Sequence, residues 1–185
     1  MALKHDLTRK VYPLKQRLRL FSSVITPTVL YGCAAWTVSS ADEGLLIRTE
    51  RRMLRMILGV RRRVRNRCQD GTAELEPWVQ WIKRASAEAK QRVTELGMTN
   101  WVQQFRRQKW RWAGELVRGD TSKWSYIAMD WAAEHENGAR RDAGRPQKRW
   151  DDFMVSITRH HCGTSDWKLI AADERLWTTL ESTIF

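Results

Sequence analysis

Arginines between residues 48 and 67 are the side chains in this sequence best suited to bind another molecule. A guanidinium group stays charged at physiological pH and can donate two parallel hydrogen bonds to one phosphate. At helical periodicity, arginines share one face of this stretch and apolar residues share the opposite face. The basic face consists of Arg48, Arg51, Arg52 and Arg55, and the apolar face of Ile47, Leu54, Ile57 and Leu58. The pattern predicts a helix that buries one side and offers guanidinium groups on the other.

A basic tail follows this helix, after Gly59 as the expected helix stop. The tail contains Arg61, Arg62, Arg63, Arg65 and Arg67. It has too little apolar surface to bury, and clustered like charges repel unless anions offset them. We therefore favour phosphate binding over a merely solvated charge run. Ser40 and Glu43 are spaced as a capping box, which predicts where the helix begins.

Further basic residues lie in two other places. The segment NGARRDAGRPQKR, residues 137–149, holds two glycines and a proline, which predict a loop or linker. Its cations are Arg140, Arg141, Arg145, Lys148 and Arg149. Arg107 and Arg111 lie on the polar face of another predicted helix. All of these arginines and the lysine are candidate nucleic-acid-binding residues.

Two clusters could in principle support an active site. Asp151 and Asp152 are adjacent carboxylates, which in polymerases hold divalent metals, but such sites need a third carboxylate. Here the pair opens a predicted helix, so we interpret both as helix-terminal residues. His160, His161 and Cys162 could join Cys33, Cys68 or His135 around zinc, yet consecutive ligands cannot all point at one ion.

No nucleotide-binding loop or hydrolase signature occurs in the sequence. We therefore expect no catalytic residue, no metal site and no cofactor in this chain. A small metal-dependent nuclease or transferase that uses the two clusters remains an alternative, and a structural helical adaptor that binds acidic protein is another.

Composition points to an anionic partner inside the cell. Lys and Arg outnumber Asp and Glu by 33 to 21, which gives a formal charge of +12 and favours nucleic acid or an anionic membrane. The longest apolar run, residues 21–36, is interrupted by polar residues and too short to span a membrane. Three widely spaced cysteines indicate reduced thiols. We expect an intracellular protein, nuclear or cytoplasmic, that is neither secreted nor bound to membrane.

Helical periodicity recurs along the chain and predicts an all-α fold of helical hairpins or an irregular bundle. Besides the arginine helix, we expect helices over 13–30 with a bend at Pro27, then over 77–96, 101–118, 124–134, 150–157 and 173–182. The second and third of these should pair as an antiparallel hairpin. Lys109 falls in an apolar arc and should extend its amine to solvent. The residues expected to be buried are Trp78, Ile82, Ala89, Trp101, Phe105, Trp112 and Leu116.

These elements suggest four segments: a helical part with its basic tail over 1–67, a hairpin with a short helix over 68–136, the basic linker over 137–149, and helices over 150–185. Three stretches, Thr26 to Val60, Arg106 to Arg118 and Gly144 to Phe153, together resemble the region that follows the catalytic domain in non-LTR (LINE-type) retrotransposon reverse transcriptases. The specific signals are Leu30-Tyr31-Gly32 with Trp36, the ending Ile57-Leu58-Gly59-Val60, and Gly144-Arg145-Pro146 with Arg149-Trp150.

The resemblance implies a thumb-like helical part that grips RNA and/or DNA as a template-primer duplex, alongside the catalytic part of a reverse transcriptase. The aspartate-bearing palm of that family is absent here, as a truncated or residual reading frame would explain. The chain should then be no enzyme in isolation. Glu115 stands where the family often has a histidine, so no role of that histidine carries over.

Overall fold

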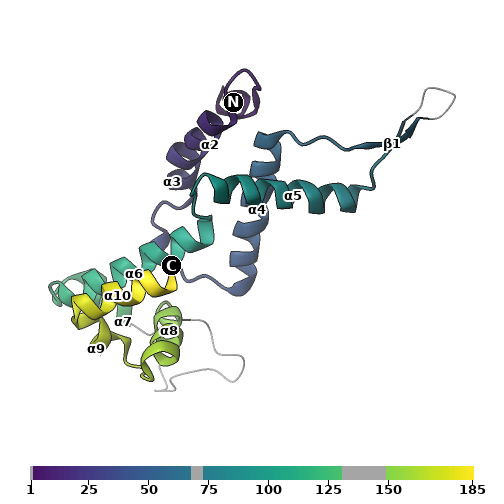
Figure 1. Ribbon diagram of the computed structural model, residues 1–185. Coiled ribbons are helices and arrows are strands. Elements are labelled where there is room, and N and C mark those ends of the chain that lie inside the picture. The colour runs from purple at the N-terminus through teal and green to yellow at the C-terminus, as the bar shows by residue number, and fades with distance from the viewer. Residues whose placement is uncertain (1, 68–72, 131–148) are drawn as a thin grey trace, which may run out of the picture. The chain divides into compact units, whose positions relative to one another are not determined.

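The computed structural model describes residues 2–67, 73–130 and 149–185, and it confirms the predicted all-α fold (Figure 1). The chain forms two compact units. Unit 1 comprises Met1–Tyr31 and Glu43–Val102, and unit 2 comprises Gly32–Asp42 and Gln103–Phe185. The units therefore group residues differently from the four segments expected from sequence. No helix in the described residues is long and apolar enough to cross a membrane.

Unit 1 begins with α1 (Ala2–Thr8) and then a nearly continuous helical run of α2 (Leu14–Leu20), a π-helical turn (Phe21–Ile25) and α3 (Thr26–Val29). This run is the predicted 13–30 helix, and Pro27 disturbs it as expected. Because proline cannot donate a backbone hydrogen bond and its ring crowds the preceding turn, the helix widens just before it. The N–H of Thr26 accordingly donates to the carbonyl of Phe21.

The predicted arginine helix is α4 (Ser40–Leu58), and its apolar face is buried through Leu54 and Ile57. Gly59 adopts a φ of 64° and donates its N–H to Arg55 O, so it ends the helix as predicted. The cap differs by one residue. Ser39 and Asp42 exchange reciprocal bonds, with Ser39 N–H on Asp42 Oδ2 at 2.9 Å and Asp42 N–H on Ser39 Oγ at 3.3 Å.

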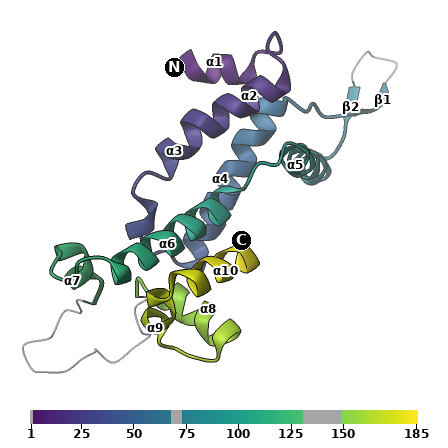
Figure 2. The ribbon, with the colours of Figure 1, turned by 60° about the vertical axis from the view of Figure 1, so that its left-hand side comes forward.

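After α4 the basic tail becomes strand β1 (Val64–Arg67), paired antiparallel with β2 (Ala73–Leu75). No strand was expected here from the sequence. The next helix, α5 (Trp78–Glu95), starts after Pro77 and ends before Gly97, as predicted. In Figure 1 α5 crosses α4, and in Figure 2 it is seen nearly end-on beside that helix. Arg55 Nη1 on α4 donates to Ser86 Oγ on α5 at 2.9 Å.

Burial along α5 corrects one prediction. Ala85, Ala89 and Val93 are buried, but Trp78 at the start of the helix is 60% exposed. Periodicity placed Trp78 on the correct face, but the elements that cover this face do not extend to its first turn. Of the remaining residues expected to be buried, Trp101, Phe105 and Leu116 are buried, and Ile82 and Trp112 are half-buried.

Unit 2 contains most of α6 (Trp101–Arg118), together with a 3-10 turn (Cys33–Ala35), α7 (Trp124–Asp130), α8 (Asp152–Cys162), α9 (Trp167–Ala172) and α10 (Glu174–Ile184). No sequence pattern predicted α9. Because α5 and α6 belong mainly to different units, their antiparallel pairing stays a prediction.

The core of unit 2 is built on α6 and α10. Trp110 and Trp177 stack with ring centroids 3.6 Å apart, and each indole N–H donates to the other residue's carbonyl. Gly114 permits this approach, since a Cβ there would lie 2.6 Å from Trp177 Nε1.

Candidate nucleic-acid interface

The basic face of α4 is exposed as the sequence predicted. Arg48, Arg51 and Arg52 project from the side opposite the buried Leu54 and Ile57. Among the residues that the structure describes, none forms a hydrogen bond or salt bridge with these three guanidinium groups. Three exposed cations that make no such bond, within about one turn of a helix, are suited to a polyanion, because the phosphates of a nucleic acid offer a similarly dense run of negative charges.

Arg55 belongs to the same face but differs from its neighbours. Its side chain is half-buried and its Nη1 is engaged by Ser86 of α5. Arg55 therefore helps to hold α5 across α4, and part of its donor capacity is already used.

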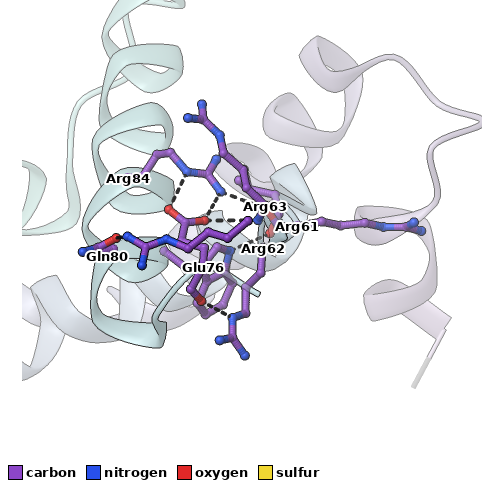
Figure 3. A network of polar contacts seen from close by, with 9 residues as sticks. Arg61, Arg62, Arg63, Glu76, Gln80 and Arg84 are labelled. Atoms are coloured by element: carbon purple, nitrogen blue, oxygen red, sulfur yellow. Dashed lines mark hydrogen bonds and ion pairs between the residues drawn. The ribbon is translucent and has the colours of Figure 1, made fainter. Parts of the chain in front are cut away.

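The basic tail is fixed through one carboxylate, that of Glu76 (Figure 3). Arg84 on α5 donates to both Glu76 oxygens, from Nε to Oε1 at 3.1 Å and from Nη2 to Oε2 at 2.7 Å. The backbone N–H of Arg63 donates to Oε2 at 3.2 Å, and Arg62 Nε donates to the Glu76 carbonyl at 2.7 Å. The hydrogen bonds from Arg84 hold the pKa of Glu76 at about 2. The carboxylate is consequently ionised, and it accepts three hydrogen bonds.

The tail arginines keep their side chains at the surface. Arg61, Arg62, Arg63 and Arg65 are all exposed, and Arg65 Nη2 donates to Gln80 Oε1 on α5 at 3.0 Å. For Arg67 the structure describes the backbone, which pairs with Ala73, and not the side chain. The tail thus presents arginines whose backbone is fixed and whose guanidinium groups still have free donors.

The sequence did not predict the pairing of Glu76 with Arg84. They are eight residues apart, across the start of a helix, so no helical spacing links them, and the sequence signal was only an acidic residue just before Pro77.

Arg107 and Arg111 form contacts within unit 2 that the sequence did not predict. Arg107 Nη2 donates to Phe185 O at 2.7 Å, and Arg111 Nη2 lies 2.7 Å from Glu181 Oε1. Both arginines therefore tie α10 to α6. Arg111 is still exposed on one side, whereas Arg107 is half-buried.

Of the loop cations, Arg140, Arg141, Arg145 and Lys148 lie outside the described residues, and Arg149 is exposed. The helix-terminal interpretation of the two aspartates is confirmed. Asp152 Oδ2 accepts the N–H of Arg149 at 2.8 Å, and Asp151 Oδ2 accepts the indole N–H of Trp167 at 3.3 Å.

His160 and His161 are exposed and Cys162 is half-buried. Within the described ranges no group of His, Cys, Asp or Glu is placed to hold a metal. Cys68 and His135 lie outside these ranges.

Lys109 lies in the interior of unit 2, where it contacts two other residues of the sequence motifs. The prediction that its amine extends to solvent is therefore wrong. The residue is 2% exposed, its Nζ donates to Trp36 O at 2.7 Å, and the ammonium lies 4.9 Å from the Trp150 ring centroid. Trp150 Nε1 in turn donates to Ala34 O at 2.8 Å. The ammonium is buried because a carbonyl and an aromatic face satisfy it. The motifs that contain Trp36, Lys109 and Trp150 thus contact one another and stabilise unit 2.

Comparison with known proteins yields one informative relative. The chain is 25% identical to an uncharacterised transposon-derived protein of Caenorhabditis elegans over 176 residues, which are 93% of this chain and 56% of that protein. The chain thus spans just over half of the relative's length. No family model matches the chain, and no solved structure matches it.

Proposed function

We propose that this chain is a transposon-derived protein that binds nucleic acid through backbone phosphates. The observation that carries the proposal is the face of α4, where Arg48, Arg51 and Arg52 are exposed and form no hydrogen bond or salt bridge with described residues. An arginine that serves only the fold is expected to form an internal ion pair, as Arg111 does with Glu181. The net charge of +12 supports an anionic partner of high charge density.

We further propose that the protein corresponds to the thumb and following region of a non-LTR retrotransposon reverse transcriptase. Two observations support this assignment: the three motif stretches named above, and the similarity to a transposon-derived protein. In this role the chain grips an RNA and/or DNA template-primer duplex and works beside the catalytic part of a polymerase. Binding of this kind is dominated by phosphates and carries little sequence preference.

In our proposal the chain binds nucleic acid and catalyses no reaction. Asp151 and Asp152, the residues with the greatest resemblance to a catalytic pair, are engaged at the start of α8. The competing nuclease or transferase would need those carboxylates directed at a metal instead. The competing adaptor would bind acidic protein, whose affinity depends less steeply on salt than that of a nucleic acid.

The test is a salt titration of binding to RNA, DNA and hybrid duplexes. The variant Arg48→Ala with Arg52→Ala removes two exposed cations of α4 and leaves the Arg55 bond to Ser86 intact. We expect lower affinity and a log-log salt slope that is shallower by up to about 1.8, at about 0.9 per phosphate contact on duplex DNA.

The matched control is Lys15→Ala with Arg19→Ala, which removes the same charge from exposed positions of α2 in the same unit. The control should keep the wild-type slope. Equal slopes for all three proteins would contradict the assignment of the α4 face, and no binding at low salt would contradict nucleic-acid binding altogether.

A further inference from the structure

Large apolar side chains are exposed together on the β-hairpin and the start of α5. Val64 and Leu75 are directly paired across the two strands and are 50% and 41% exposed. Trp78 and Val79, in the first turn of α5, are 60% and 58% exposed. Exposure of an indole is costly in water, and clustered apolar exposure of this kind typically marks a binding surface.

Two arginines of the tail are bonded to residues on either side of Trp78 in sequence. Arg62 is held through its Nε by the carbonyl of Glu76, two residues before Trp78, and Arg65 is held by Gln80, two residues after it. The nearby carboxylate of Glu76 is already engaged by Arg84. We call Val64, Leu75, Trp78 and Val79, with Arg62 and Arg65, the Trp78 surface.

We infer that the Trp78 surface binds a single-stranded segment of RNA or DNA, with one base stacked on the indole of Trp78 and neighbouring phosphates on Arg62 and Arg65. An aromatic ring flanked by arginines is the combination that single-strand binding sites use, because every base offers a π-face and every nucleotide a phosphate. In a duplex the bases are already stacked and paired, so they cannot cover the ring.

The positive charge of the Trp78 surface argues against a second copy of the chain as its occupant. A second copy of the chain would bring its own arginines against these, at a net charge of +12 on each molecule. The inference rests on the proposed nucleic-acid binding and adds to it. The α4 face contacts phosphates of any strand, whereas the Trp78 surface selects an unpaired one.

The decisive variant is Trp78→Ala in the full chain, assayed by binding to single-stranded RNA and DNA oligonucleotides on the order of a dozen residues long. We expect affinity for single strands to fall about 5- to 150-fold, which corresponds to the loss of one stacked base. The salt slope should stay unchanged, because no charge is removed, and duplex affinity should stay near that of the wild type. Trp78→Phe should retain most of the single-strand affinity.

Trp124→Ala is the matched control, since Trp124 is 83% exposed on α7, away from the arginine tail in sequence. It should bind single strands as the wild type does. A second measurement is ultraviolet cross-linking of a bound oligonucleotide, which should place the linked base on the peptide that contains Trp78.

Three results would overturn the inference. If Trp78→Ala and Trp124→Ala both bind single strands like the wild type, the surface does not stack bases, and the proposed duplex binding by α4 stands. If Trp78→Ala instead turns a self-associated protein into a monomer without loss of single-strand affinity, the occupant is a second copy. If the wild type binds no nucleic acid at low salt, this inference and the proposed function both fail.

Discussion

Replacement of Glu50 by Gln should change how the stability of unit 1 depends on pH. Glu50 lies on α4, is 6% exposed, and accepts the backbone N–H of Trp101 at the start of α6 on its Oε1 at 3.1 Å. Burial raises the pKa of this carboxyl from 4.5 to about 7, while the Trp101 N–H and the nearby Arg51 oppose the rise. At neutral pH the folded protein therefore holds a buried acid near its midpoint of ionisation.

The sign of the effect follows from proton binding. Because the folded state binds the proton more tightly than the unfolded state, the contribution to stability is fully present below about pH 4.5. It is lost as pH rises through about 7. Each pH unit between the two pKa values is worth about 1.4 kcal/mol, so the loss amounts to about 3 kcal/mol. Gln keeps the acceptor for Trp101 and never ionises, so Glu50→Gln should lack this loss.

The assay is urea denaturation at a series of pH values, followed by circular dichroism. The difference in free energy of unfolding between Glu50→Gln and wild type should grow in favour of the variant by about 3 kcal/mol between pH 4.5 and pH 8. Glu115→Gln, at an exposed position of α6, is the matched control and should follow the wild-type profile. Parallel profiles for wild type and Glu50→Gln would refute the argument and mean that water reaches this carboxyl.

Phe105→Ala should lower the free energy of unfolding by about 3 to 5 kcal/mol, since Phe105 is buried. A loss below about 1 kcal/mol in urea denaturation would contradict its packing. Gly114→Ala should lower the melting temperature, because the new Cβ would meet the Trp177 indole at 2.6 Å. Glu76→Gln should speed hydrogen exchange of the Arg63 amide, because it weakens the acceptor of that N–H. In the wild type, this hydrogen bond should weaken only as pH falls toward the Glu76 pKa of about 2. With magnesium or manganese the protein should neither extend a primer nor cut DNA, and metal-dependent activity abolished by Asp152→Asn would overturn that expectation.

Hydrophobic periodicity predicted the features that are determined within a single helix, namely its faces and its ends. The basic and apolar faces of α4, its stop at Gly59 and the start of α5 after Pro77 all follow from residue spacing and backbone preference. These features are local, so a single sequence suffices to predict them.

Features that depend on where a helix is covered could not be predicted in this way. Trp78 lies on the apolar stripe of α5, yet its exposure depends on how far neighbouring elements reach along the helix. Lys109 was placed at the surface because nothing in the local sequence announces the Trp36 carbonyl and the Trp150 ring that receive it. The pairing of Glu76 with Arg84 joins a residue before α5 to one within it, so no helical spacing predicts it.

The π-helical turn before Pro27 also constrains how this region can evolve. One such turn is equivalent to a single residue inserted into an α-helix, so the segments on either side are rotated against each other by about 100° relative to an uninterrupted helix. Leu18 upstream and Leu30 downstream are both buried with that offset in place. Deletion of one residue from 21–25 would make the helix regular and would turn one of these leucines out of the core. Single-residue deletions here should therefore be purged by selection, whereas paired changes that move Pro27 and the buried positions together can persist.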